Sequence, residues 1–248
     1  MLQFIMIFLV GSIFGSFYNV VGLRVPIGKS IIKPRSHCTS CCKELTFIEL
    51  IPIFSFVFQK GKCRNCHYKI RITYPIIEFL TGCLFLIAFY RLNHINDLIQ
   101  AFLLISLLMI IVVSDLAYML IPNKILLLFF IFLSFNKLLF FKASIISSII
   151  CMFCLFLLLF IFSIVTKGGI GGGDVKLLSL LAFVFPYPSI FILFMTSCIA
   201  GTIIGAILRL TNQIKKNDPI PFGPFIAFST FFTYFFDQQL LNIYRAVL

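Results

Sequence analysis

Residues 98–121 read LIQAFLLISLLMIIVVSDLAYMLI, and this stretch decides the fold class of the chain. An α-helix needs about 20 predominantly apolar residues to cross the ~30 Å hydrocarbon core of a bilayer. The stretch is long enough for that and carries one charged residue, Asp115. Because lipid cannot satisfy unpaired backbone groups, the run predicts a transmembrane helix.

Similar apolar runs recur along the 248 residues, of which 61% are hydrophobic and only 11% charged. A soluble domain has about 25% charged residues. We therefore expect an all-α polytopic membrane protein with about eight transmembrane helices. The first run lacks a basic n-region and a small-residue cleavage site, so we expect a retained helix rather than a signal peptide. The expected helices cover residues 2–21, 74–90, 98–121, 125–140, 143–165, 174–185, 189–210 and 222–241.

One long polar loop, residues 22–73, separates the first helix from the rest and divides the chain into 1–21, 22–73 and a transmembrane bundle, 74–248. It contains two Cys-x2-Cys pairs, which are Cys38 with Cys41 and Cys63 with Cys66. In a reducing compartment this spacing favours a metal over disulfides. Four thiolates suit a closed tetrahedral Zn²⁺ site, which would stabilise a loop too poor in apolar residues for its own core.

Other residues in the loop have simpler interpretations. His37 and His67 flank the metal ligands and are possible substitutes for one of them, and free or redox-active thiols are the alternative to zinc. Cys42 is expected to be a bystander. The apolar stretch 47–58 is too short to span a bilayer and fits an interfacial or packed segment.

The distribution of positive charge predicts the orientation of the chain. Its net charge is +12, but the basic residues cluster in a few loops and form no tract interleaved with aromatic residues, which argues against nucleic acid as a partner. An excess of Lys and Arg marks cytoplasmic loops. The rule places the cysteine loop inside, together with Lys124, Lys167, Lys176, Arg209, Lys215 and Lys216.

Two acidic residues, Asp115 and Asp174, lie in apolar surroundings, where an ionisable group is costly and usually functional. Asp115 precedes the end of its run by six residues, about 9 Å along a helix. The helix that begins near Asp174 is too short to span the membrane, so this residue should begin below the surface as well. The glycines 171–173 before it would allow backbone to approach closely there.

Two carboxyl groups that share a site do not both ionise easily, so one can act as base on a water while the other, protonated, stabilises an oxyanion. This favours a hydrolase with Asp115 and Asp174 as the candidate catalytic residues. Helix capping remains an alternative role for Asp174, which follows glycines at a helix N-terminus. The sequence assigns no individual role to either residue.

The motifs together resemble the type IV prepilin leader peptidases. Gly-Gly-Gly-Asp (171–174) is similar to the GxGD motif of that family of membrane aspartic proteases. Further similarities cover nearly the whole chain in order. They are the first-helix signature at 11–26, the four-cysteine loop, Tyr-Pro-Ile-Ile-Glu at 74–78, Ser-Asp and Leu-Ile-Pro at 114–122, and Pro-Phe-Gly-Pro at 221–224. Asn123 departs from the acidic residue that often follows the Ile-Pro.

The resemblance implies a cytoplasmic-membrane endopeptidase that removes a short basic leader from prepilins or pseudopilins after a glycine, with Asp115 and Asp174 as the catalytic pair. In many members it also implies N-methylation of the new terminus with S-adenosylmethionine, for which no binding residue can be named. The Phe-, Ile- and Lys-rich composition suits a competence-pilus enzyme. Structural Zn²⁺, the lipid bilayer and a prepilin are the expected cofactor and partners.

Three other classes compete with this interpretation. A membrane thiol-disulfide oxidoreductase would use the CxxC pairs, including Cys151 and Cys154, but these two lie in an apolar helix that favours packing. It also leaves both aspartates unexplained. A proton-coupled transporter would leave the cysteine loop without a role, and a presenilin-like protease would not need that loop.

Overall fold

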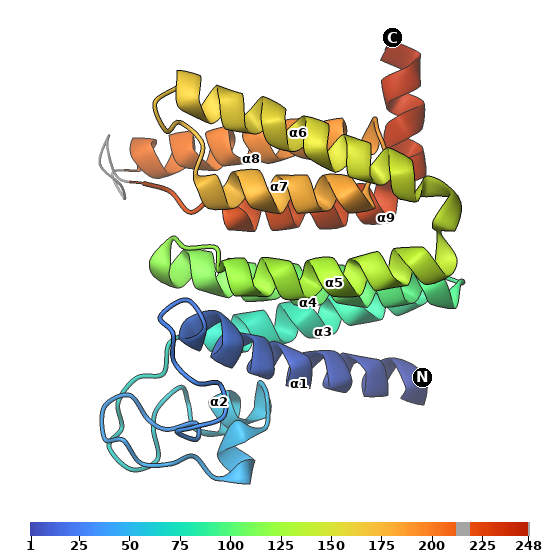
Figure 1. Cartoon of the computed structure of the whole chain (residues 1–248). Coiled ribbons are helices and arrows are strands. Elements are labelled where there is room, and N and C mark those ends of the chain that lie inside the picture. Colours follow the sequence, from blue (N-terminus) through green and yellow to red (C-terminus); the bar gives the residue numbers. More distant parts are fainter. Residues whose placement is uncertain (212–218, 248) are drawn as a thin grey trace. The chain divides into compact units, whose positions relative to one another are not determined.

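The computed structural model describes residues 1–211 and 219–247, and its regular elements in these ranges are all helices, with two isolated β-bridges in the cysteine loop (Figure 1). Lys215 and Lys216 lie outside the described residues. The elements are α1 (Leu2–Arg24), η1 (Phe47–Leu50), α2 (Phe54–Phe58), α3 (Thr73–Arg91), α4 (Ile95–Tyr118), α5 (Asn123–Phe140), η2 (Lys142–Ser144), α6 (Ile145–Val165), α7 (Gly172–Val184), α8 (Ser189–Leu210) and α9 (Gly223–Val247).

Six of the described helices, α1, α3, α4, α5, α6 and α8, are long and apolar enough to cross a membrane. This confirms the predicted all-helical polytopic class. The expected count of about eight spans is not confirmed, because α7 has 13 residues and the apolar part of α9, Gly223–Phe236, is also short. Helix α9 bends at Phe236, whose backbone is not helical.

The backbone contacts divide the chain into two compact units, Met1–Ser114 and Asp115–Leu248. In the first unit, α1 and α3 pack along each other through small residues on one face of α1. A Cβ added to Gly11 would lie 2.9 Å from Cα of Gly82, and one added to Gly15 would lie 2.8 Å from Cα of Glu78. Small residues that let backbones approach are typical of helix pairs in membranes.

The second unit is built around α7, which contacts α5, α6 and α8. Its side chains from Leu177 to Phe183 are all buried, with Leu177, Leu178 and Leu181 fully inaccessible. The charges at its two ends interact favourably with the helix dipole. Asp174 lies in the first turn, and in the last turn Lys137 of α5 donates a hydrogen bond to the carbonyl of Phe183 at 2.6 Å. A short, largely buried helix therefore presents Asp174 at its N-terminus.

Candidate functional site

Asp115 lies in the last turn of α4, with 5% of its surface exposed. The sequence placed it six residues before the end of its helix, but α4 ends at Tyr118, because Met119 adopts a left-handed conformation with φ 53°. The expected depth below the helix end therefore falls from about 9 Å to about 4.5 Å. The Asp115 carboxylate therefore lies nearer to the end of its helix than the sequence predicts.

The carboxylate of Asp115 accepts a hydrogen bond from the backbone amide of Gly223, with 2.7 Å between N and Oδ2. Gly223 is the first residue of α9, where amides lack intrahelical partners and the helix dipole is positive. A Cβ at this position would lie 2.8 Å from Oδ2 of Asp115, so only glycine allows the carboxylate to come this close. Helix α9 thus supplies a backbone donor to Asp115.

Asp174 is the third residue of α7, and its side chain turns back toward Gly171, the residue before the helix. A Cβ on Gly171 would lie 2.9 Å from Oδ2 of Asp174. None of the described side-chain hydrogen bonds caps the α7 N-terminus, and the N-cap residue is a glycine. The negative charge of Asp115 acts electrostatically on Asp174, so the two carboxyl groups belong to one electrostatic environment.

The N-terminal turn of α7 packs against the turn that follows α4. A Cβ on Gly173 would lie 3.0 Å from Cβ of Ile121, so the glycine allows close packing there. One turn further along, Lys176 donates a hydrogen bond to the side-chain oxygen of Asn123 at 3.0 Å. Asn123 departs from the pattern of the resembling family, yet its amide oxygen serves as acceptor for a lysine.

The predicted metal ligands also converge. Sγ atoms of Cys38, Cys41, Cys63 and Cys66 all lie within 4.8 Å of one another, with 3.7 Å between Cys38 and Cys66. Tetrahedral coordination with Zn–S bonds of about 2.3 Å places sulfurs roughly 3.8 Å apart. The four side chains therefore fit a zinc ion, which would be held by four thiolates with no position left for substrate.

The two Cys-x2-Cys segments form the same turn twice. Cys38 and Cys63 each donate their amide to the carbonyl five residues later, at 3.0 and 2.9 Å, and their own carbonyls accept the amides of Cys42 and His67, both at 3.0 Å. Cys42 and His67 adopt the same left-handed conformation, each with φ 55°. The extra cysteine thus occupies a turn position equivalent to that of His67, outside the group of four ligands.

Backbone amides within these turns favour thiolates. The amide of Lys43 lowers the pKa of Cys41 to about 6, and the amide of Cys66 lowers the pKa of Cys63. The amide of Tyr68 lowers the pKa of Cys66, but burial and the three neighbouring cysteines outweigh this effect and raise that pKa to about 11. Four thiols this close do not all ionise by themselves, and a divalent cation would remove that conflict.

Sequence reasoning missed the role of the Gly223 amide. A backbone donor has no side-chain signature, and the Pro-Phe-Gly-Pro motif only indicated a helix start. Cys151 and Cys154 lie on α6 as free cysteines, of which Cys151 is half-buried and Cys154 exposed. The comparisons below do not favour the oxidoreductase alternative.

Residues 9–92 match the bacterial peptidase A24 N-terminal domain, and residues 102–206 match the type IV leader peptidase family. The chain is 40% identical to the prepilin leader peptidase/N-methyltransferase of Bacillus subtilis (strain 168), over 96% of each chain. It is 31% identical to a protein of the same name from Aeromonas hydrophila, over 91% of this chain and 88% of the relative. The namesake from Aeromonas salmonicida is 29% identical, over 100% of this chain and 95% of the relative.

No solved structure matches the chain. The Bacillus relative covers both units and the cysteine loop, and the two family matches follow each other in the order of the chain. Six of the described helices are also long and apolar enough to cross a membrane. The chain belongs to the type IV prepilin leader peptidase family.

Proposed function

We propose that this enzyme removes the leader of a type IV prepilin or pseudopilin by a two-aspartate mechanism at the cytoplasmic face of the cell membrane. The observation that carries the proposal is the packing of the α7 N-terminus, which bears Asp174, against the turn that follows Asp115 and the end of α4, with 3.0 Å between a Cβ on Gly173 and Cβ of Ile121. The names of the relatives support prepilins as substrates. Lys124 at the start of α5 and Lys176 at the start of α7 support a cytoplasmic orientation.

The surroundings of the two carboxyl groups suggest a division of labour. Asp115 accepts the Gly223 amide at a helix N-terminus, which favours its ionised form. Asp174 then retains the proton that the pair shares. Asp115 would take a proton from a water molecule while the oxygen of that water attacks the scissile carbonyl. Asp174 would donate a hydrogen bond to the developing oxyanion. Collapse of the tetrahedral intermediate breaks the C–N bond, and the leaving nitrogen takes up the proton that Asp115 removed from water, which restores the Asp115 carboxylate.

Zinc would serve the fold of the cysteine loop, since four protein ligands leave no open coordination position. We assign it no step in the cleavage. The names of the relatives also include N-methyltransferase, and S-adenosylmethionine would supply the methyl group. A hollow lined by residues 8–13 of α1 and by residues 51–54 has apolar walls that do not fit this charged cofactor. No residue is therefore assigned to S-adenosylmethionine.

The direct test uses the purified enzyme in detergent or lipid nanodiscs with a synthetic prepilin. Mass spectrometry should show two products separated after the glycine that ends the leader. A further mass increase of one methyl group, only when S-adenosylmethionine is present, would establish the second activity. An intact prepilin after prolonged incubation with zinc-replete enzyme would contradict the proposed function.

A further inference from the structure

The segment Phe47–Phe58, which contains η1 and α2, exposes large apolar side chains within an otherwise polar loop. Phe47 is 87% exposed, Val57 65% and Phe58 79%. Contiguous apolar surface of this kind is unfavourable in water and usually marks a protein or membrane contact. Neither the metal centre nor the aspartates use these side chains.

The middle of the segment is tied to a membrane helix by a buried carboxylate. Glu78 on α3 is 8% exposed and accepts the amide of Ile53 at 2.7 Å. Ile53 has φ 64° and ψ −54°, and the amide of Phe54 donates to the carbonyl of Pro52 at 2.6 Å, which together define a γ-turn. This turn is rare and strained for a β-branched residue, so the contacts around it must hold it in place.

The turn lies well below the basic ends of the helices that it contacts. It shares a hollow with residues 8–13 of α1. Ser12 in that stretch precedes Arg24 by twelve residues, about 18 Å along the helix. Glu78 follows Thr73 by five residues, about 7.5 Å. Both α1 and α3 are long enough to span a bilayer, so the turn reaches the depth of the hydrocarbon.

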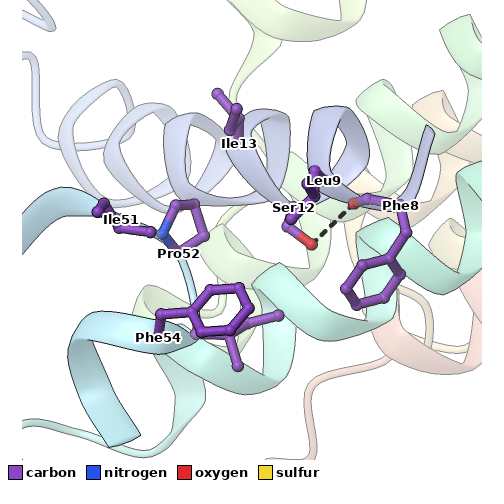
Figure 2. Close-up of a pocket in the computed structure, with 8 residues that line it drawn as sticks. Phe8, Leu9, Ser12, Ile13, Ile51, Pro52 and Phe54 are labelled. Atoms are coloured by element: carbon purple, nitrogen blue, oxygen red, sulfur yellow. Dashed lines mark hydrogen bonds between the residues drawn. The ribbon is translucent and has the colours of Figure 1, made fainter. Parts of the chain in front are cut away.

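A hollow of about 230 Å³ separates the turn from α1 (Figure 2). Ser12 supplies the one side-chain hydroxyl of the lining, and it donates to the carbonyl of Phe8 at 2.9 Å, as the dashed line shows. The walls therefore offer apolar contacts and no free hydroxyl donor. The lining residues are Phe8, Leu9, Ser12, Ile13, Ile51, Pro52, Ile53 and Phe54.

We propose that Phe47–Phe58 is a re-entrant membrane anchor and that the hollow between its turn and α1 holds an acyl chain of a bilayer lipid. The apolar walls of the hollow, and its place beside two helices long enough to span a bilayer, favour an acyl chain over a polar ligand. Ile13, Ile51 and Phe54 in the lining are each about half exposed, so the hollow is open to the surroundings of α1 and accessible to lipid.

The chain contains no tryptophan, so an introduced one reports on a single site. The variants Phe54→Trp and Phe58→Trp place it in the anchor, and Tyr68→Trp, in the second cysteine turn, is the matched control. Each variant is reconstituted in phosphatidylcholine–phosphatidylglycerol bilayers with or without lipids brominated on the acyl chain. The fluorescence of both anchor variants should at least halve with brominated lipid, and that of Tyr68→Trp should stay nearly constant. Equal quenching at all three positions would overturn the anchor.

The occupant is identified by photo-crosslinking in the same bilayers. A phosphatidylcholine with a diazirine in its acyl chain should label peptides containing Ile13 or Ile51–Phe54, as mapped by mass spectrometry. Adding a prepilin should leave this labelling unchanged. Loss of lipid labelling, with crosslinks from a diazirine-bearing prepilin appearing at the same residues, would assign the hollow to the substrate and overturn the proposal. Neither readout requires peptidase activity, so failure here is distinct from failure of the proposed function.

Discussion

The amide of Gly223 lies 2.7 Å from Oδ2 of Asp115, at a position where a Cβ would lie 2.8 Å from the same oxygen. A carboxylate at the end of one helix is thus held by the first amide of another, 108 residues later in the chain. This relationship makes the candidate site sensitive to a single methyl group, and it connects a motif near the end of the chain to the chemistry proposed for its middle.

Gly223→Ala should lower kcat for prepilin cleavage by about 10- to 100-fold, because a displacement of about 1 Å in a catalytic group has effects of this size. The measurement is steady-state cleavage of a synthetic prepilin. Gly28→Ala is unsuitable as a control because Gly28 has a positive φ of 70°. Gly172→Ala is suitable, since a Cβ there meets nothing within 4 Å. Equal activity of the Gly223 and Gly172 variants would contradict a positioning role for the Gly223 amide.

Asp115→Asn and Asp174→Asn should each reduce cleavage by about 10²–10⁴-fold, the usual contribution of general acid–base groups. An amide at either position is isosteric but can neither take nor supply the proton. Both variants should still insert into the membrane and bind zinc, which separates a chemical defect from misfolding. Full cleavage by either variant would remove that aspartate from the mechanism.

The three glycines before Asp174 should respond differently to alanine. A Cβ on Gly171 would lie 2.9 Å from Oδ2 of Asp174, and one on Gly173 would lie 3.0 Å from Cβ of Ile121. Gly172 faces open space. Activity measured on the same prepilin should therefore fall for Gly171→Ala and Gly173→Ala and stay close to wild type for Gly172→Ala. An equal loss of activity in all three variants would mean that steric crowding by the added Cβ does not cause the loss.

Cys41→Ser should lose bound zinc, whereas the neighbouring Cys42→Gly should keep one zinc per chain. Cys42 lies outside the ligand group and has φ 55°, which glycine adopts freely. Removing that strain should stabilise the loop by about 1 kcal/mol. Metal analysis by mass spectrometry and limited proteolysis of the loop give the two readouts. Zinc retained by Cys41→Ser, or lost by Cys42→Gly, would contradict the assignment of ligands.

Acid should release the metal. The pKa of Cys41 is lowered to about 6 in the folded loop. The Cys41 thiolate therefore makes its full contribution to the stability of the fold at pH values above about 8.5, the pKa of an unfolded thiol. This contribution declines as the pH falls toward 6, and protons compete with zinc in the same direction. Dialysis against a chelator at about pH 7.5 and at about pH 5 should leave zinc bound in the first case and remove it in the second. Equal retention at both values would argue against thiolate ligands.

The helices were largely predictable because long apolar runs in a membrane have few alternatives to the helix. The expected helix 189–210 coincides with α8, and the expected helix 2–21 lengthens only to Arg24. The expected helix 98–121 extends three residues beyond the end of α4, because nothing in its apolar sequence indicates that Met119 adopts a left-handed conformation. Local backbone conformations of this kind depend on contacts that a single sequence does not display.

The candidate site was predictable to the extent that it consists of side chains out of place in their surroundings. Asp115 and Asp174 are carboxyl groups in apolar sequence, and the four ligands have a recognisable spacing. The Gly223 amide and the Glu78–Ile53 hydrogen bond are different, because they connect distant segments through backbone groups that every residue has. Only the fold distinguishes such groups from the rest.

Gly11 and Gly15 bring α1 against α3 with almost no space between the backbones, and the side-chain amide of Asn19 donates to the carbonyl of Tyr74 at 3.2 Å. Both ends of the cysteine loop are therefore fixed by a helix pair that does not depend on metal. Stripping the zinc should accordingly unravel the loop alone and leave a correctly inserted pair of helices, ready to refold the loop when the metal returns. Metal supply would then set the fold of the loop in a protein already in place in the membrane.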